Sequence, residues 1–191
     1  MKMDYSNEID RHFLQYEAVR TKAASEIALV DRYPFADLVI EREFQKADDS
    51  LEQVYAKIVL LNEMYSTRIF GTFEVALNIW KVKDFRERVC QGDPDLVEEI
   101  RGQSIGGKSR DLYSFATKYC HNHNPAGYPI FDNLVCRRLC EELARTGVRI
   151  VRRRLRNYQY FKAAVDKLAE LWKIRPDQKY RKLDRYLWRQ E

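Results

Sequence analysis

The chain has 191 residues and a mass of 22.8 kDa, which is enough for one compact domain with a sizeable buried core. Hydrophobic residues make up 45% of it and charged residues 33%, with only 7 glycines and 5 prolines. This composition is typical of soluble globular proteins and favours helices over a sandwich of short strands. The formal net charge of +5 suits a polyanionic partner, but charge alone does not specify any chemistry.

Other features of the composition concern location and cofactors. No apolar run approaches the roughly 20 residues that a membrane span needs, and the N-terminus MKMDYSNEID lacks the apolar stretch of a signal peptide. We therefore expect a cytoplasmic protein without a membrane partner. The cysteines at positions 90, 120, 136 and 140 form no C-x-x-C pair. We accordingly expect reduced thiols, no metal site and no cofactor.

Apolar positions that recur at steps of three and four predict the helices of the first half of the chain. The first helix is expected from Asp4 to Tyr33, with Pro34 ending it. Further helices are expected at about Ala36–Gln45, Leu51–Tyr65, Thr72–Trp80 and Phe85–Cys90. The polar cluster 48–50 can cap the third of these helices. The tripeptide Gly92-Asp93-Pro94 predicts that one helix ends and another begins.

The central stretch runs from Ser104 to Leu139. Gly106 and Gly107 predict a turn, and a helix is expected to open at Lys108. A polar loop with two prolines follows, and Asp132 is placed to cap the next helix, which continues to about residue 145.

The segment after this helix is rich in arginine, with five in the nine residues 148–156. Such a run is usually a solvated face, but a grip on phosphates is the competing interpretation. The last two helices, about Tyr158–Lys173 and Asp177–Trp188, are expected to pack against the first helix. The sequence thus predicts an all-α bundle of about eight helices that forms a single domain over residues 1–191.

Two motifs resemble the helix-hairpin-helix DNA glycosylases. Ser104-Ile105-Gly106-Gly107-Lys108-Ser109 is similar to the G-V-G-x-K-T hairpin of that family, and the segment Phe131–Val135 is similar to its V-D-T-H-V segment. The stretch Tyr113–Tyr119, together with the later segment Tyr128–Asp132, also resembles a divergent bacterial branch related to the oxoguanine glycosylases. The resemblance implies a trimmed glycosylase fold that binds double-stranded DNA, and we expect a monomer.

The same resemblance identifies candidate catalytic residues. Asp132 matches a carboxylate that stabilises the positive charge developing on the sugar, although a capping role alone would also explain it. Lys108 matches the hairpin lysine that forms a Schiff base, a reaction that requires a neutral amine. Lys118 lies in an apolar helix and is expected to need a buried partner, such as Asp132 or a bound nucleotide. The two lysines are weighed equally as catalytic groups. The long spacing between Lys108 and Asp132 favours an enzyme that uses water as its nucleophile.

Other residues are candidates for binding. The resemblance implies that the end of the Leu51–Tyr65 helix fills the gap left by a flipped base, and core packing is the alternative explanation for these residues. Candidates for the base pocket or this wedge are Asn62, Met64, Tyr65, Ser66, Tyr113, His121 and His123. Candidates for contacts with the DNA backbone are Gly106, Gly107, Arg152, Arg153 and Arg154.

These features lead to a functional hypothesis. We expect an N-glycosylase that flips a damaged or modified base out of DNA and leaves an abasic site, because the glycosidic bond is inaccessible in the stack. Some relatives of this divergent kind resemble antiviral glycosylases that act on modified phage bases. The alternatives are a DNA-binding module without catalysis and, more remotely, a helical protein-interaction domain.

Overall fold

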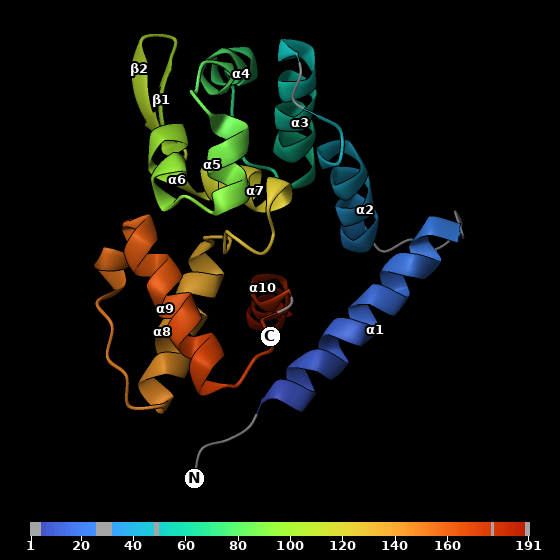
Figure 1. Cartoon of the computed structure of the whole chain (residues 1–191), viewed down its shortest axis with the longest axis vertical. Coiled ribbons are helices and arrows are strands. Elements are labelled where there is room, and N and C mark those ends of the chain that lie inside the picture. The colour runs from blue at the N-terminus through green and yellow to red at the C-terminus, as the bar shows by residue number, and fades with distance from the viewer. Residues whose placement is uncertain (1–4, 26–31, 48–49, 177, 190–191) are drawn as a thin grey trace.

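Figure 1 shows a computed structural model of the chain, which describes residues 5–25, 32–47, 50–176 and 178–189. Within these ranges the chain forms ten α-helices, one short 3₁₀ helix (η1) and one two-stranded hairpin. The elements are α1 (Ser6–Ser25), α2 (Arg32–Phe44), α3 (Leu51–Met64), α4 (Thr72–Trp80), α5 (Phe85–Gln91), α6 (Pro94–Arg101), β1 (Gly102–Ile105), β2 (Lys108–Asp111), α7 (Tyr113–His123), α8 (Asn133–Arg145), η1 (Arg152–Arg156), α9 (Tyr158–Leu171) and α10 (Lys179–Arg189). The predicted all-α class is confirmed, with more helices than the eight expected.

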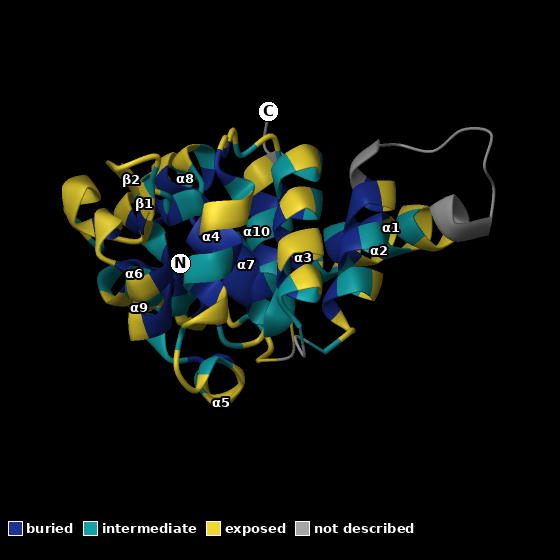
Figure 2. Ribbon diagram, turned by 90° about the horizontal axis from the view of Figure 1, so that it is seen from above, coloured by how far each residue is buried: buried dark blue, intermediate teal, exposed yellow. Residues whose placement is uncertain are grey.

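Helix α7 lies at the centre of the molecule. Most of its residues are buried, as the dark colour near its label in Figure 2 shows, and it contacts α2, α3, α5 and α6. Buried apolar residues contributed by helices from α1 to α10 form one contiguous cluster around it. Because α7 is enclosed in this way, any polar group on it is held in a largely apolar environment.

Several predicted helix ends are confirmed because they depend on local backbone chemistry. Ser50 and Gln53 form a capping box at the start of α3. Gly92 ends α5 in the left-handed region (φ +71°), and the side chain of Asp93 then caps α6, with Pro94 at its first position. These caps fix where the chain turns between helices.

The prediction that Pro34 ends the first helix is wrong. Helix α2 begins at Arg32, so Pro34 lies in its first turn, where the missing N–H group would have no partner inside the helix in any case. Helix α1 is described to Ser25, and the remainder of the predicted first helix falls partly on residues 26–31, outside the described residues.

The prediction that a helix opens at Lys108 is also wrong. Lys108 begins strand β2 and pairs with Ile105 of β1. Gly106 and Gly107 both have positive φ, which is the backbone of a two-residue hairpin turn whose twist matches paired strands. The helix expected here begins instead at Tyr113.

Of the last two helices, α10 packs against α1 as predicted, whereas α9 mainly contacts η1, α6 and α8. Helix α10 contacts both α1 and α8, and Figure 1 shows it end-on between these elements. Lys182 of α10 pairs with Asp10 of α1 at 2.8 Å, and the ring of Trp172, after α9, contacts Tyr5. The N-terminal and C-terminal helices therefore support each other. No helix in the described ranges has both the length and the apolar character to cross a lipid bilayer.

Candidate active site

A cavity of about 230 Å³ opens where the end of α3, α7, the start of α8 and α10 meet. We call it the Lys118 cavity. Five of its lining residues are among the residues singled out in the sequence: Met64, Tyr65, Ser66, Lys118 and Asp132. The fold adds four more, Ile130, Asp184, Arg185 and Trp188. The structure thus brings Lys118 and Asp132 together, with the end of the predicted wedge helix beside them.

Asp132 is the N-cap of α8. Its backbone is extended (φ −136°, ψ 151°), and its Oδ1 accepts a hydrogen bond from the backbone N–H of Leu134 at 2.7 Å. This bond fixes the orientation of the carboxylate at the edge of the Lys118 cavity. Capping therefore accounts for the position of Asp132 without using all of its hydrogen-bonding capacity.

Lys118 supplies the amine of the cavity. Its Nζ donates to Ser114 Oγ at 3.0 Å and lies 5.2 Å from the centre of the Tyr65 ring. Burial lowers the pKa of Lys118, while the charges of Asp132 and Asp184 act in the opposite direction, and the net shift is downward. A lysine with a lowered pKa is neutral in a larger fraction of molecules, as nucleophilic catalysis by an amine requires.

Asp184 is a second carboxylate in the cavity and comes from α10. Burial raises its pKa from 3.8 to about 7, with the charge of Lys118 opposing the rise and that of Asp132 adding to it. Two acidic groups in one cavity thus have different environments, since Asp132 is held by a backbone donor and Asp184 is desolvated. A carboxyl group whose pKa is raised by burial in a cavity is typical of sites that move protons.

Asp37, a buried residue of α2, binds two of the residues that line the cavity. Its carboxylate forms an ion pair with Arg185 and accepts hydrogen bonds from the hydroxyl groups of Tyr16 and Tyr65, the latter at 3.3 Å. The guanidinium of Arg185 also lies over the ring of Tyr16. This network joins α1, α2, α3 and α10, and it holds Tyr65 and Arg185 in place at the cavity wall.

The loop that follows α3 is rigidly held by Asn62. Its side chain accepts a hydrogen bond from Ile69 N at 2.9 Å and donates to Ile69 O at 3.1 Å, so Asn62 braces the loop and does not line the cavity. Ser66 and Arg68 occupy the left-handed region (φ +49° and +56°), which costs energy in residues other than glycine. Phe70, which follows Ile69 in this loop, is 97% exposed.

The hairpin residues lie elsewhere. Lys108 is exposed on β2 and does not line the Lys118 cavity, and Gly106 and Gly107 form the hairpin tip. At the base of the hairpin, Arg101 and Arg156 both pair with Asp111. The hairpin is therefore tied to η1, which carries the exposed residues Arg152, Arg153 and Arg154.

The remaining pocket candidates have other surroundings. Tyr113 is buried under the hairpin and donates from its hydroxyl to Leu155 O at 3.0 Å. His121 is buried, with Nδ1 2.6 Å from Tyr128 O, and lines a small cavity beside the Lys118 cavity. Burial lowers the pKa of His121 to about 4. His123 lines a separate, larger cavity.

Three of the four residues that sequence reasoning missed share a cause. Ile130 precedes Asp132 by two positions, whereas Asp184, Arg185 and Trp188 come from α10, which only the tertiary fold brings to α7. The available signal was Asp184 itself, an acidic residue beside the buried Leu183 in a strongly amphipathic helix. In the described ranges no group of three or more His, Cys, Asp or Glu side chains is arranged to hold a metal ion.

Comparisons with known proteins give a family. The HI_0787_N family model, described as an N-terminal domain, matches residues 16–127, which is more than half of the chain. A protein of Haemophilus influenzae, titled uncharacterized, is 37% identical over 143 residues, which cover 74% of this chain and 67% of that protein. No solved structure matches the chain. The matched range includes Lys118 and Tyr65. The chain belongs to the HI_0787_N family.

Proposed function

We propose that the protein is a DNA N-glycosylase whose reaction takes place in the Lys118 cavity. The observation that supports this proposal most strongly is that Lys118 and Asp132, which the sequence suggested as partners, line one cavity. A partly buried amine with a lowered pKa, in one cavity with a fixed carboxylate, suits cleavage of a nucleoside bond by an amine nucleophile.

The proposed reaction gives each group one role. The neutral amine of Lys118 attacks C1′ of the sugar while the bond between C1′ and the base nitrogen breaks, and the electron pair of that bond leaves with the base. Asp132 stabilises the positive charge that develops on the sugar. Asp184, with a pKa of about 7, holds a proton in a large fraction of molecules at neutral pH and supplies it to the leaving base. The C1′–O4′ bond then breaks, with its electron pair going to O4′, which takes one proton from the lysine nitrogen; the lone pair left on that nitrogen forms the C=N bond of a protonated Schiff base with Lys118.

This scheme departs from the water nucleophile favoured by the spacing between Lys108 and Asp132. Lys108 is exposed on β2, whereas Lys118 lines the cavity and is partly buried there. A lysine that is already inside the cavity needs no movement of the hairpin to reach a sugar. The proposed nucleophile is therefore Lys118, and the hairpin is left for contact with the DNA backbone.

The walls of the cavity suit a base that has left the stack. The Tyr65 ring lies beside Lys118. Trp188, which is 41% exposed, lines the same cavity from α10. Aromatic side chains hold an extruded base by stacking on its faces. Phe70, exposed at the end of the braced loop, is the side chain that we propose enters the duplex in place of the flipped base.

The test uses duplexes with normal, oxidised, alkylated, deaminated and phage-modified bases. The purified protein is incubated with each, and abasic sites are detected by cleavage with alkali. We expect one class to yield abasic sites, and borohydride to trap a covalent protein–DNA adduct on Lys118, located by peptide mass spectrometry. Product without any adduct would favour water as nucleophile, and no product with any substrate would contradict the proposal.

The second candidate is a DNA-binding module without catalysis. The exposed arginines of η1 and the net charge of +5 favour it independently of the cavity. It is distinguished by the same experiment, since a module of this kind binds duplex DNA in a salt-dependent way and releases no base.

A further inference from the structure

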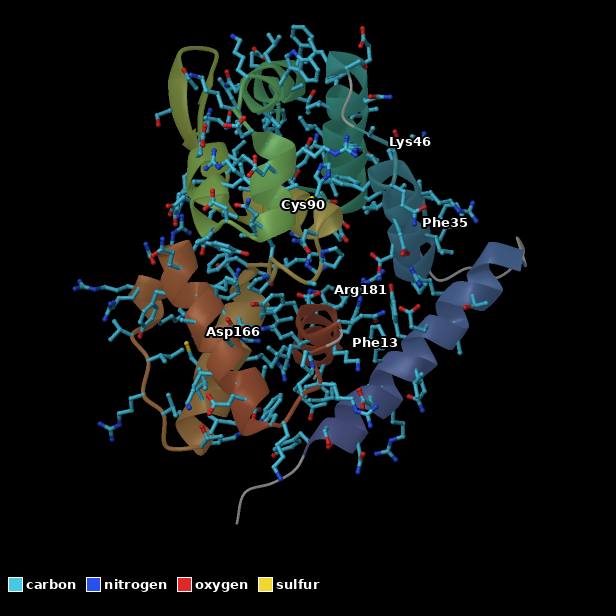
Figure 3. The ribbon with its side chains drawn as sticks, viewed as in Figure 1. Phe13, Phe35, Lys46, Cys90, Asp166 and Arg181 are labelled. Atoms are coloured by element: carbon cyan, nitrogen blue, oxygen red, sulfur yellow. The ribbon has the colours of Figure 1, made fainter. Side chains whose placement is uncertain are left out.

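A second cavity is lined by His123, the last residue of α7. Its volume is about 420 Å³, and it shares no lining residue with the Lys118 cavity. We call it the His123 cavity. It is lined by the end of α2, the segment after it, and residues of α3, α4, α5 and α7. Figure 3 labels two of the lining residues, Lys46 and Cys90. This volume falls in the range of small-molecule sites.

The interior of the His123 cavity is apolar and aromatic. Phe44, Val54, Ile79 and Val89 are buried and form its floor. The His123 ring meets Phe44 and Phe85 edge to face, with ring centres 4.8 Å and 5.2 Å apart. Rings held at these angles provide flat and edge contacts for another planar ring.

The charged side chains found among the described lining residues of this cavity are both basic. Among the described residues that line it, the charged side chains are Lys46 and Arg86, and none is a carboxylate. Lys57, buried behind the wall, donates from Nζ to Lys46 O at 2.7 Å and lies 5.3 Å from the centre of the Phe44 ring. Lys46 also pairs with Glu43 outside the cavity, so Arg86 is the stronger candidate for contact with an anion.

We propose that the His123 cavity binds a small ligand that combines a planar aromatic ring with one anionic group. The ring packs on Phe44, Phe85 and His123, and the anion faces Arg86 and Lys46. This site is independent of the proposed glycosylase activity, because the two cavities have no residue in common.

The experiment uses 2-naphthoate as the probe, with neutral 2-naphthamide and aliphatic hexanoate as matched controls. Affinity is measured by calorimetry, and the site is located through Cys90, which is exposed and lines the cavity. We expect 2-naphthoate to slow the alkylation of Cys90 by iodoacetamide severalfold, without changing the labelling of Cys140, which lies on α8. Both controls should bind about fivefold more weakly or worse, since each lacks one of the two contacts.

Variants test the assignment. Arg86→Glu should weaken binding of 2-naphthoate about fivefold, Arg86→Lys should restore most of it, and Lys118→Met should leave it unchanged. Because Arg86 is exposed, the two Arg86 substitutions are not expected to affect folding. The proposal would be overturned if 2-naphthamide bound as tightly as 2-naphthoate, or if 2-naphthoate did not protect Cys90. It would also be overturned if Lys118→Met lost binding while Arg86→Glu kept it.

Discussion

The amine of Lys118 lies 5.2 Å from the centre of the Tyr65 ring, so the middle of α7 meets the end of α3 at the wall of the Lys118 cavity. This contact keeps the amine out of bulk water, and burial is the main cause of its lowered pKa. The other side of the cavity is formed by α10.

The first prediction concerns Asp132. Asp132→Asn should lower base release at least about 100-fold, because the charge that stabilises the sugar is removed. Stability should change little, since Asn also caps helices, whereas Asp132→Ala should cost about 1 kcal/mol through loss of the cap. Single-turnover cleavage and thermal melting measure the two effects separately. Full activity of Asp132→Asn would remove this residue from the mechanism.

The second prediction compares the two lysines. Lys118→Met should abolish both base release and the borohydride-trapped adduct, because no amine remains in the cavity. Lys108→Gln is the matched control and should only weaken DNA binding, since Lys108 is exposed on the hairpin. Gel analysis of trapped complexes distinguishes the variants. An adduct lost on Lys108→Gln and kept in Lys118→Met would reverse the assignment.

The third prediction is a pH dependence that arises from Asp184. Burial raises its pKa from 3.8 to about 7. The contribution of this carboxyl to stability is therefore fully present below pH 3.8 and is lost as the pH rises towards 7. The Tm of Asp184→Asn relative to wild type should rise across this interval and then level off.

The control for this experiment is Glu170→Gln, which changes an exposed carboxyl of α9. Its Tm should follow that of the wild type at every pH. Calorimetric scans at closely spaced pH values provide the measurement. A constant Tm difference between Asp184→Asn and wild type would mean that this carboxyl titrates alike in the folded and unfolded chain.

The fourth prediction concerns Phe70, which is 97% exposed. Phe70→Ala should leave thermal stability unchanged and lower base release from duplex DNA about tenfold, because base–aromatic stacking is worth about 1–3 kcal/mol. Release from single-stranded DNA should be unaffected, since no gap in a stack needs to be filled. Phe73→Ala is the control, because Phe73 is also exposed but packs against Tyr55. Equal losses on both substrates would argue against insertion of Phe70.

The fifth prediction concerns the arginines of η1. Replacing Arg152, Arg153 and Arg154 with Gln should weaken DNA binding and reduce the slope of log K against log salt by about 0.9 for each lost phosphate contact. The control replaces the exposed residues Arg11, Arg42 and Arg175, which lie away from η1 in the sequence. Binding isotherms at several salt concentrations give the slopes. An unchanged slope in the first variant would identify the run as a solvated face.

The sequence predicts structure correctly where the interactions involved are local, and less well where they join residues far apart in the chain. Helix ends at Ser50, Gly92 and Asp132 were predictable because each is set by hydrogen bonds or dihedral angles within a few residues. Lys108 was misplaced because a Gly-Gly pair is compatible with either a turn into a helix or a turn between strands. The choice between these depends on the pairing of β1 with β2.

The candidate site was predictable only in part for the same reason. Lys118 and Asp132 belong to neighbouring elements and carry a recognisable local pattern. Asp184 and Trp188 reach the cavity because α10 packs on α1 and α8. The sequence around these two residues has no distinctive motif that predicts this packing. The conformation of the loop before Phe70 likewise involves bonds from the Asn62 side chain to the Ile69 backbone, seven residues away.

The position of α10 links occupancy of the Lys118 cavity to the integrity of the chain's last helix. Three residues of this helix line the cavity, so a molecule bound there contacts α10 as well as α7 and holds the two together. Any ligand that binds only the assembled form shifts the equilibrium towards that form. Protection of the C-terminal segment from proteases should therefore report occupancy of the cavity, even for a ligand on which no reaction occurs.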